Sequence, residues 1–133
     1  MLKETITYKN FDGKEVVRDL YFNLNEAEIH EMEFTTPGGY KGMLERIVAA
    51  QDMPSLFLEF KAFILKAYGE KSADGEYLHK SPEISKRFED SQAYSDFFIK
   101  LISSPENAAN FVNRVIPNVP EKGDNPTPVA ATN

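Results

Sequence analysis

The most apolar run of the chain lies in the middle of the sequence, from Pro54 to Gly69. At 3.6 residues per turn its large apolar side chains fall on one broad face, which predicts a helix. Pro54 suits the first turn because its missing N–H would be unpaired there, and Gly69 suits the left-handed position that commonly follows a helix. The main face consists of Leu56, Phe60, Phe63, Ile64 and Ala67, with Phe57 and Tyr68 at its margin.

A second apolar strip runs along the same helix, away from the main face. It consists of Leu58, Ala62 and Leu65, and we call it the second strip. A surface helix of a monomer needs only one apolar face. The second strip is therefore either core, in a helix that is buried nearly all round, or a contact surface for another subunit or partner.

Alternating apolar and polar residues over 2–22 predict an N-terminal β-hairpin. Asp12-Gly13 is the strongest hairpin signal, and it predicts a type I′ turn, which requires positive φ at both central positions. An isolated hairpin is marginal in water, so this one is expected to lie on the helices or to extend a neighbour's sheet. Its free edge is a candidate assembly surface.

Start signals and apolar residues at helical spacing predict further helices on both sides of the central one. Asn25 can cap the first of them, and Glu28 can complete a capping box with it. A polar connection over 70–80 carries a turn signal and could form a small hairpin. The other predicted helices begin near Tyr40, Ser81, Ser91 and Ser104.

These elements define an α+β fold that is predominantly helical, with the hairpin followed by five to six helices. We predict one globular domain over residues 1–117, with the hairpin within 2–22 and the helices within 25–116. Residues 118–133 are rich in proline and polar side chains and contain nothing large to bury. They are predicted to form a disordered tail.

The composition is that of an ordinary acidic protein, with 41% hydrophobic residues, 27% charged residues and a net charge of −6. This charge argues against nucleic acid as a partner, because phosphate binding needs clustered Lys and Arg. The absence of cysteine excludes disulfides and thiolate chemistry and fits a reducing cytoplasm. No apolar stretch approaches the ~20 residues of a membrane span, so we expect a cytoplasmic protein with no membrane partner.

Candidate catalytic and metal-binding patterns fail one by one. His30 shares a helical face with Glu26 and Glu33, but the zincin motif needs a second histidine at position 34, which is Phe34. That face is interpreted as a solvated acidic surface. The stretch 69–72 resembles a phosphate loop but lacks its first glycine and follows a helix. We expect no catalytic site, no metal and no cofactor.

Four stretches after the hairpin carry packing and turn residues in a distinctive order: Tyr21–Glu28, Leu65–Gly75, Gln92–Ser95 and Ala108–Pro117. Together with the hairpin they resemble the tail assembly chaperones of long-tailed siphophages that infect low-GC Gram-positive bacteria. The resemblance covers about residues 1–117 and includes no catalytic signature.

The resemblance implies a non-catalytic role. Such chaperones bind the long, aggregation-prone tape measure protein, keep it soluble and help tail-tube subunits polymerise around it. They act in the cytoplasm of the infected host and are absent from the finished virion, and many are also made in a longer, frameshifted form. The implied partners are therefore the tape measure protein and the tail-tube protein. Self-association is expected too, because repeated copies along one long client add avidity.

Two surfaces are candidates for holding an apolar client helix, which binds in a groove or against another helix. One is the second strip and the other is an aromatic face near residues 94–98, and each could instead be core. Replacing Leu58 and Leu65 by glutamate is predicted to preserve the fold and abolish self-association or client binding. The candidate partner-binding residues are Leu58, Ala62, Leu65, Tyr94, Phe97 and Phe98.

Two other functions fit the same sequence. The protein could be a structural virion component, such as a tail terminator or a head–tail connector. It could also be a small host-directed regulator.

Overall fold

Strands β1 (Leu2–Lys9) and β2 (Glu15–Phe22) form the predicted N-terminal hairpin in the computed structural model, which describes residues 1–116. The two strands are antiparallel and stay in register along their whole length. Even-numbered residues face the helices and odd-numbered residues are exposed or half-buried, as the alternation predicts.

The turn of the hairpin differs from the predicted type I′ turn. Of its two central residues only Gly13 has a positive φ, of 79°, whereas Asp12 does not. The side-chain oxygen of Asn10 holds the turn, because it accepts hydrogen bonds from the backbone N–H groups of Asp12 and Lys14 at 2.9 and 3.0 Å. An Asn side chain that bonds to the backbone in this way is a common alternative to paired positive-φ residues.

Six helices follow in residues 1–116, in agreement with the predicted α+β, predominantly helical fold. Five of them begin after a residue whose side chain caps the helix by accepting a backbone N–H three residues on, namely Asn25, Asp52, Ser81, Ser91 and Ser104. The predicted capping box of Asn25 and Glu28 is present. The helices are α1 (Glu26–Thr35), α2 (Tyr40–Ala49), α3 (Met53–Ala67), α4 (Pro82–Glu89), α5 (Gln92–Ile102) and α6 (Pro105–Val115).

Helix α3 runs directly into strand β3 (Tyr68–Lys71), which pairs with β4 (Leu78–His79). The prediction that Gly69 ends the helix in a left-handed conformation is wrong, because Gly69 is a strand residue paired with Tyr21. A Cβ atom at this position would lie 2.6 Å from the Leu78 side chain. Glycine is therefore needed here for the close approach of β4, and the sheet has the order β1-β2-β3-β4.

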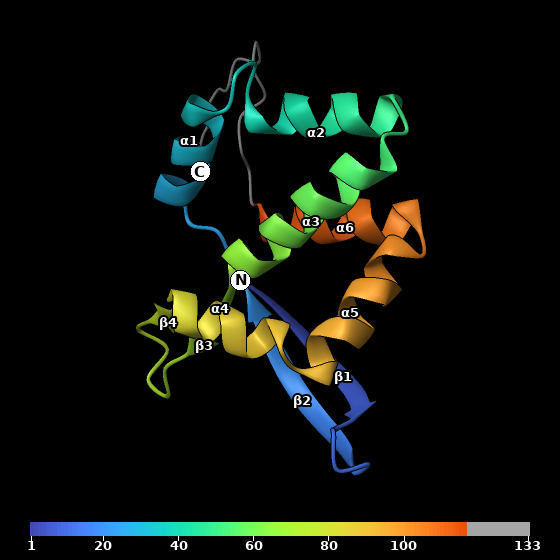
Figure 1. Cartoon of the computed structure of the whole chain (residues 1–133). Helices are drawn as coiled ribbons and strands as arrows, with labels where there is room; N and C mark the ends of the chain where they lie inside the picture. Colours follow the sequence, from blue (N-terminus) through green and yellow to red (C-terminus); the bar gives the residue numbers. More distant parts are fainter. Residues whose placement is uncertain (117–133) are drawn as a thin grey trace.

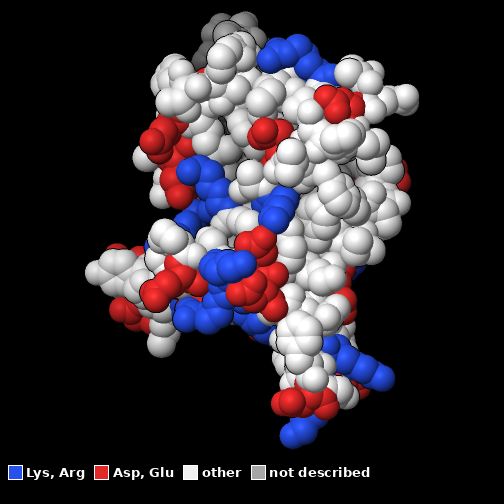
Figure 2. Space-filling view, in the orientation of Figure 1, with Lys and Arg blue, Asp and Glu red and all other residues white. Residues whose placement is uncertain are grey.

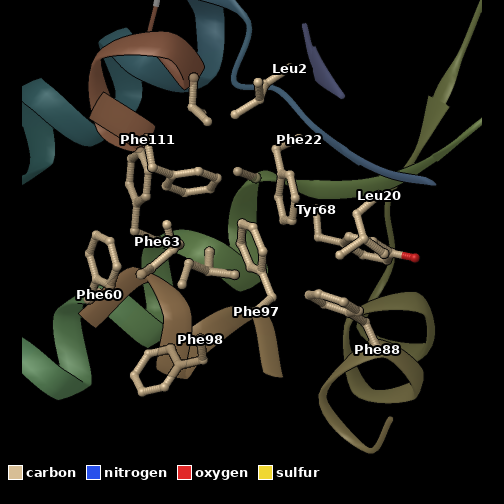
Figure 3. Close-up of a cluster of buried hydrophobic side chains, with 14 of the residues drawn as sticks. Leu2, Leu20, Phe22, Phe60, Phe63, Tyr68, Phe88, Phe97, Phe98 and Phe111 are labelled. Atoms are coloured by element: carbon tan, nitrogen blue, oxygen red, sulfur yellow. The ribbon is translucent and has the colours of Figure 1, made fainter. Parts of the chain in front are cut away.

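The core is an aromatic cluster centred on Phe22, at the end of β2 (Figure 3). Its fully buried ring lies 5.7 Å from Tyr68, 6.1 Å from Phe88, 5.0 Å from Phe97 and 5.1 Å from Phe111. These residues come from β3, α4, α5 and α6. One side chain thus joins the hairpin to most of the helical part of the fold.

The elements are spread along one long direction, with α1 and α2 at one end, α3 across the middle and the tip of the hairpin projecting at the other end (Figure 1). Helix α2 contains no buried residue, although it presents apolar side chains at the predicted spacing. The α1–α2 end is therefore more loosely packed than the Phe22 cluster.

The predicted tail, 118–133, and the predicted domain boundary at residue 117 lie outside the described residues. Within the part of the chain that is described, no helix combines the length and apolar character needed to cross a membrane.

Candidate protein-binding surface

The second strip lies on the outer side of α3 and is exposed along its first part. Leu58 is 68% exposed and Ala62 is also exposed. Leu65 is partly buried against the core, and the Ser85 hydroxyl of α4 donates a hydrogen bond to its carbonyl oxygen at 3.3 Å. The structure therefore leaves Leu58 and Ala62 accessible to solvent and covers much of Leu65.

The aromatic face predicted on α5 is divided between core and surface. Phe97 is 2% exposed and stacks on Phe22, so it belongs to the core. Phe98 is 7% exposed, and its ring lies 4.9 Å from that of Phe57 and 5.6 Å from that of the half-buried Tyr94. Phe98 thus supports two more accessible aromatic rings, one on α3 and one on α5.

The Phe57–Phe98 contact places the exposed residues of α3 next to the aromatic residues of α5, and we call the two groups together the α3–α5 patch. Figure 2 shows a broad region without charged side chains over the first half of α3 and over α5. Leu58 and the 41% exposed Phe57 lie in that half of α3. Exposed apolar areas of this kind mark interaction sites more often than isolated apolar residues do. The patch consists of Phe57, Leu58, Ala62, Tyr94 and Phe98.

A charged pair borders the α3–α5 patch. The Lys61 ammonium group lies 2.7 Å from a Glu89 carboxylate oxygen, which connects α3 to α4. Burial, and secondarily the charge of Glu89, raises the pKa of Tyr94 to about 12. None of the five residues of the patch carries a charge at physiological pH. An apolar centre with a polar rim is the usual anatomy of a protein–protein contact.

A groove between α1, α2 and α6 is a further apolar feature of the surface, which sequence reasoning missed. Its volume is about 260 Å³. The Glu33 side chain, at its edge, accepts a hydrogen bond from the backbone N–H of Tyr40 at 3.0 Å. The apolar face of α2 was the one signal in the sequence that could have predicted the groove. It was not sufficient, because nothing in the sequence indicates that α6 lies next to that face. The apolar lining residues are Ile29, Met32, Tyr40, Leu44, Val112 and Ile116.

The histidine and glutamates of the tested metal motif lie on helix α1. His30 is exposed, and its ring contacts Phe34 at a centroid distance of 5.8 Å. Among residues 1–116 no group of three or more His, Asp and Glu side chains could hold a metal ion.

An uncharged patch with a charged rim on a helical scaffold has the character of a protein-binding module. A family model described as phage tail assembly chaperone matches residues 1–123. Because this match includes most of the chain, the protein belongs to the phage tail assembly chaperone family. No curated protein and no solved structure matches the chain. Membership confirms the resemblance at the level of tail assembly chaperones, a family that is generally non-catalytic, while the siphophage and Gram-positive assignments stay predictions.

Proposed function

We propose that the chain is a chaperone that binds the tape measure protein through the α3–α5 patch and assists polymerisation of the tail tube around it. The observation that carries the proposal is the exposure of Leu58, at 68%, beside the aromatic rings of Phe57 and Phe98. Exposing a large apolar side chain next to an aromatic pair favours binding of an apolar partner. Family membership supplies the assembly role.

The geometry suits a client helix that presents apolar residues along one side. Such a helix can lie against α3, with its side chains on Leu58 and Ala62 and beside the Phe57 ring. Phe57 is already held edge-on by Phe98 at 4.9 Å, so little side-chain freedom is lost on binding. A weak contact at each copy is sufficient when many copies line one long client. Weak contacts also allow release, so the chaperone is expected in the host cytoplasm and not in the finished virion.

The test is co-expression of the full chain with the tape measure protein encoded in the same phage genome. The wild-type chain should keep that protein soluble and co-purify with it. The variant Leu58→Glu/Ala62→Glu should lose the complex, because it places two charges in the apolar contact, while its far-UV circular dichroism stays unchanged. This pair is preferable to one containing Leu65→Glu, since the partly buried Leu65 packs against the core.

The matched control is Phe34→Glu, which replaces an apolar residue that is 81% exposed on α1. It should retain the complex. Retention of the complex by the Leu58→Glu/Ala62→Glu variant would overturn the assignment of the patch. Loss of the complex with Leu44→Glu instead would move the client site to the groove between α1, α2 and α6. Stoichiometric amounts of the protein in purified virions, measured by mass spectrometry, would support a structural virion component.

A further inference from the structure

The groove between α1, α2 and α6 lies where the described part of the chain stops. Ile116, the last described residue, is one of the residues that line it. On the other side it is lined by Met32 of α1 and by Tyr40 and Leu44 of α2. Residues 117–133 continue from this point. The segment that directly follows α6 therefore starts at the groove.

The backbone leaves α6 in an extended conformation. Ile116, which follows the last helical residue, has φ −102° and ψ 97°. Pro117 accounts for this conformation, because the ring of a proline disfavours helical dihedrals at the residue before it. The next residues are Asn118, Val119 and Pro120, so Val119 also precedes a proline and is held away from helical dihedrals. This composition favours a polyproline II conformation over residues 117–120.

The polyproline II conformation places Val119 over the groove. Because this conformation has about three residues per turn, Val119 shares a face with Ile116 and lies about 9 Å further along. Ile116 already faces the groove, so Val119 falls over the same hollow. Segments of this kind bind in grooves lined by aromatic side chains. Tyr40 supplies such a ring, and it is held in place by stacking on Phe63 at a centroid distance of 6.2 Å.

Two further observations favour a packing role for residues 117–120. Helix α2 contains no buried residue, so its apolar face has room for a covering segment. The match to the family model extends to residue 123, and it therefore includes these four residues but not residues 124–133. Connecting segments vary among related proteins more than packed ones do, so a place within the family pattern favours a fixed position.

We propose that residues 117–120 occupy the groove of their own chain, with the Val119 side chain between Tyr40 and Leu44. In this position the segment is a strap that holds α2 against α6. It supplies the apolar contact that α2 lacks within residues 1–116. This inference goes beyond the proposed function and does not depend on client binding. It moves the end of the packed part of the chain from residue 117 to residue 120.

The direct test is NMR spectroscopy of the full, isotope-labelled chain. Nuclear Overhauser contacts should connect the Val119 methyl groups to the Tyr40 ring and to the Leu44 methyl groups. Val129, further along the same segment, is the internal control and should show no such contacts. Absence of contacts from Val119 would overturn the proposal. Contacts that arise only between labelled and unlabelled chains would overturn it too, because the occupant would then be a second copy.

A charged variant tests the effect of the strap on α2. Val119→Glu should displace the segment from the apolar groove, and amide hydrogen exchange within α2 should become about tenfold faster. Exchange in the second half of α3 should not change, because that half is core. The matched control Val129→Glu should leave both helices unaffected. Exchange in α2 that is equally slow in Val119→Glu and in the wild-type chain would contradict the proposal.

A milder variant covers the case in which Val119→Glu fails to fold, as judged by circular dichroism. Val119→Ala shortens the side chain without adding a charge, and exchange within α2 should become about threefold faster. Both variants should still keep the tape measure protein soluble, since the α3–α5 patch is untouched. Loss of that protein with unchanged exchange in α2 would overturn the strap and assign the groove to the client. Failure of the Leu58→Glu/Ala62→Glu test leaves the NMR contacts of Val119 unaffected, so the two proposals fail separately.

Discussion

The two halves of helix α3 have a similar apolar composition but opposite surroundings. In the second half Phe60, Phe63, Ile64 and Ala67 are all at most 4% exposed. In the first half Met53 is 56% exposed, Phe57 41% and Leu58 68%. The difference shows that one continuous apolar helix can be core at one end and exposed surface at the other.

The two halves of α3 differ in exposure because different side chains surround them. The ring of Phe63 is 5.9 Å from Phe111 of α6 and 6.2 Å from Tyr40 of α2, so neighbours enclose it. Around the first half, the Phe57–Phe98 contact with α5 leaves Leu58 open. Apolar area that no neighbour covers contributes nothing to folding and remains available for association.

Among variants of the two halves, the largest loss of stability is expected from Phe63→Ala in the buried half. Phe63 is 1% exposed, and its removal should lower the free energy of unfolding by about 3–5 kcal/mol through lost burial and the cavity left behind. Urea denaturation followed by circular dichroism measures this loss. A decrease of less than about 1 kcal/mol would show that the second half of α3 is not core.

An intermediate effect is expected from Gly69→Ala, where the buried half of α3 continues into β3. The new Cβ would lie 2.6 Å from the Leu78 side chain and 3.0 Å from the His79 carbonyl oxygen. The free energy of unfolding should fall by about 1–3 kcal/mol, in the range of other overpacked sites. Adding Leu78→Ala should recover part of the loss, and no recovery would place the strain in the backbone of β4.

The smallest effect is expected from Leu58→Ala in the exposed half. The free energy of unfolding should change by no more than about 0.5 kcal/mol, because the side chain is already in contact with water. The same urea titration serves as the measurement. A loss comparable to that of Phe63→Ala would mean that Leu58 is covered in solution, and the contrast between the two halves would disappear.

Local signals in the sequence predicted most elements of the fold. The caps at Asn25, Ser81 and Ser104 act within three residues along the chain, so a linear reading finds them. The small hairpin predicted over 70–80 is present as the pair of β3 and β4. The pairing of β3 with β2 was missed because β2 lies far away in the sequence. Gly69 was misassigned for the same reason, since its role depends on Leu78 approaching from another strand.

The candidate site was predictable as a set of apolar stripes but not as a surface. Leu58 and Phe97 both lie on apolar stripes of a helix, yet one is 68% exposed and the other 2%. Periodicity shows which residues share a face, but it does not show which faces find a neighbour. The groove between α1, α2 and α6 illustrates the same limit, because it exists only where three separate segments meet.

The direct passage from α3 into β3 has a mechanical consequence. No connecting residues lie between Ala67 and Tyr68, and Tyr68 is already paired with Phe22 in the sheet. A rotation or tilt of α3 would therefore pull on hydrogen-bonded strands, and no hinge can absorb it. Leu58 and its neighbours therefore hold a fixed orientation relative to the sheet, before any partner binds.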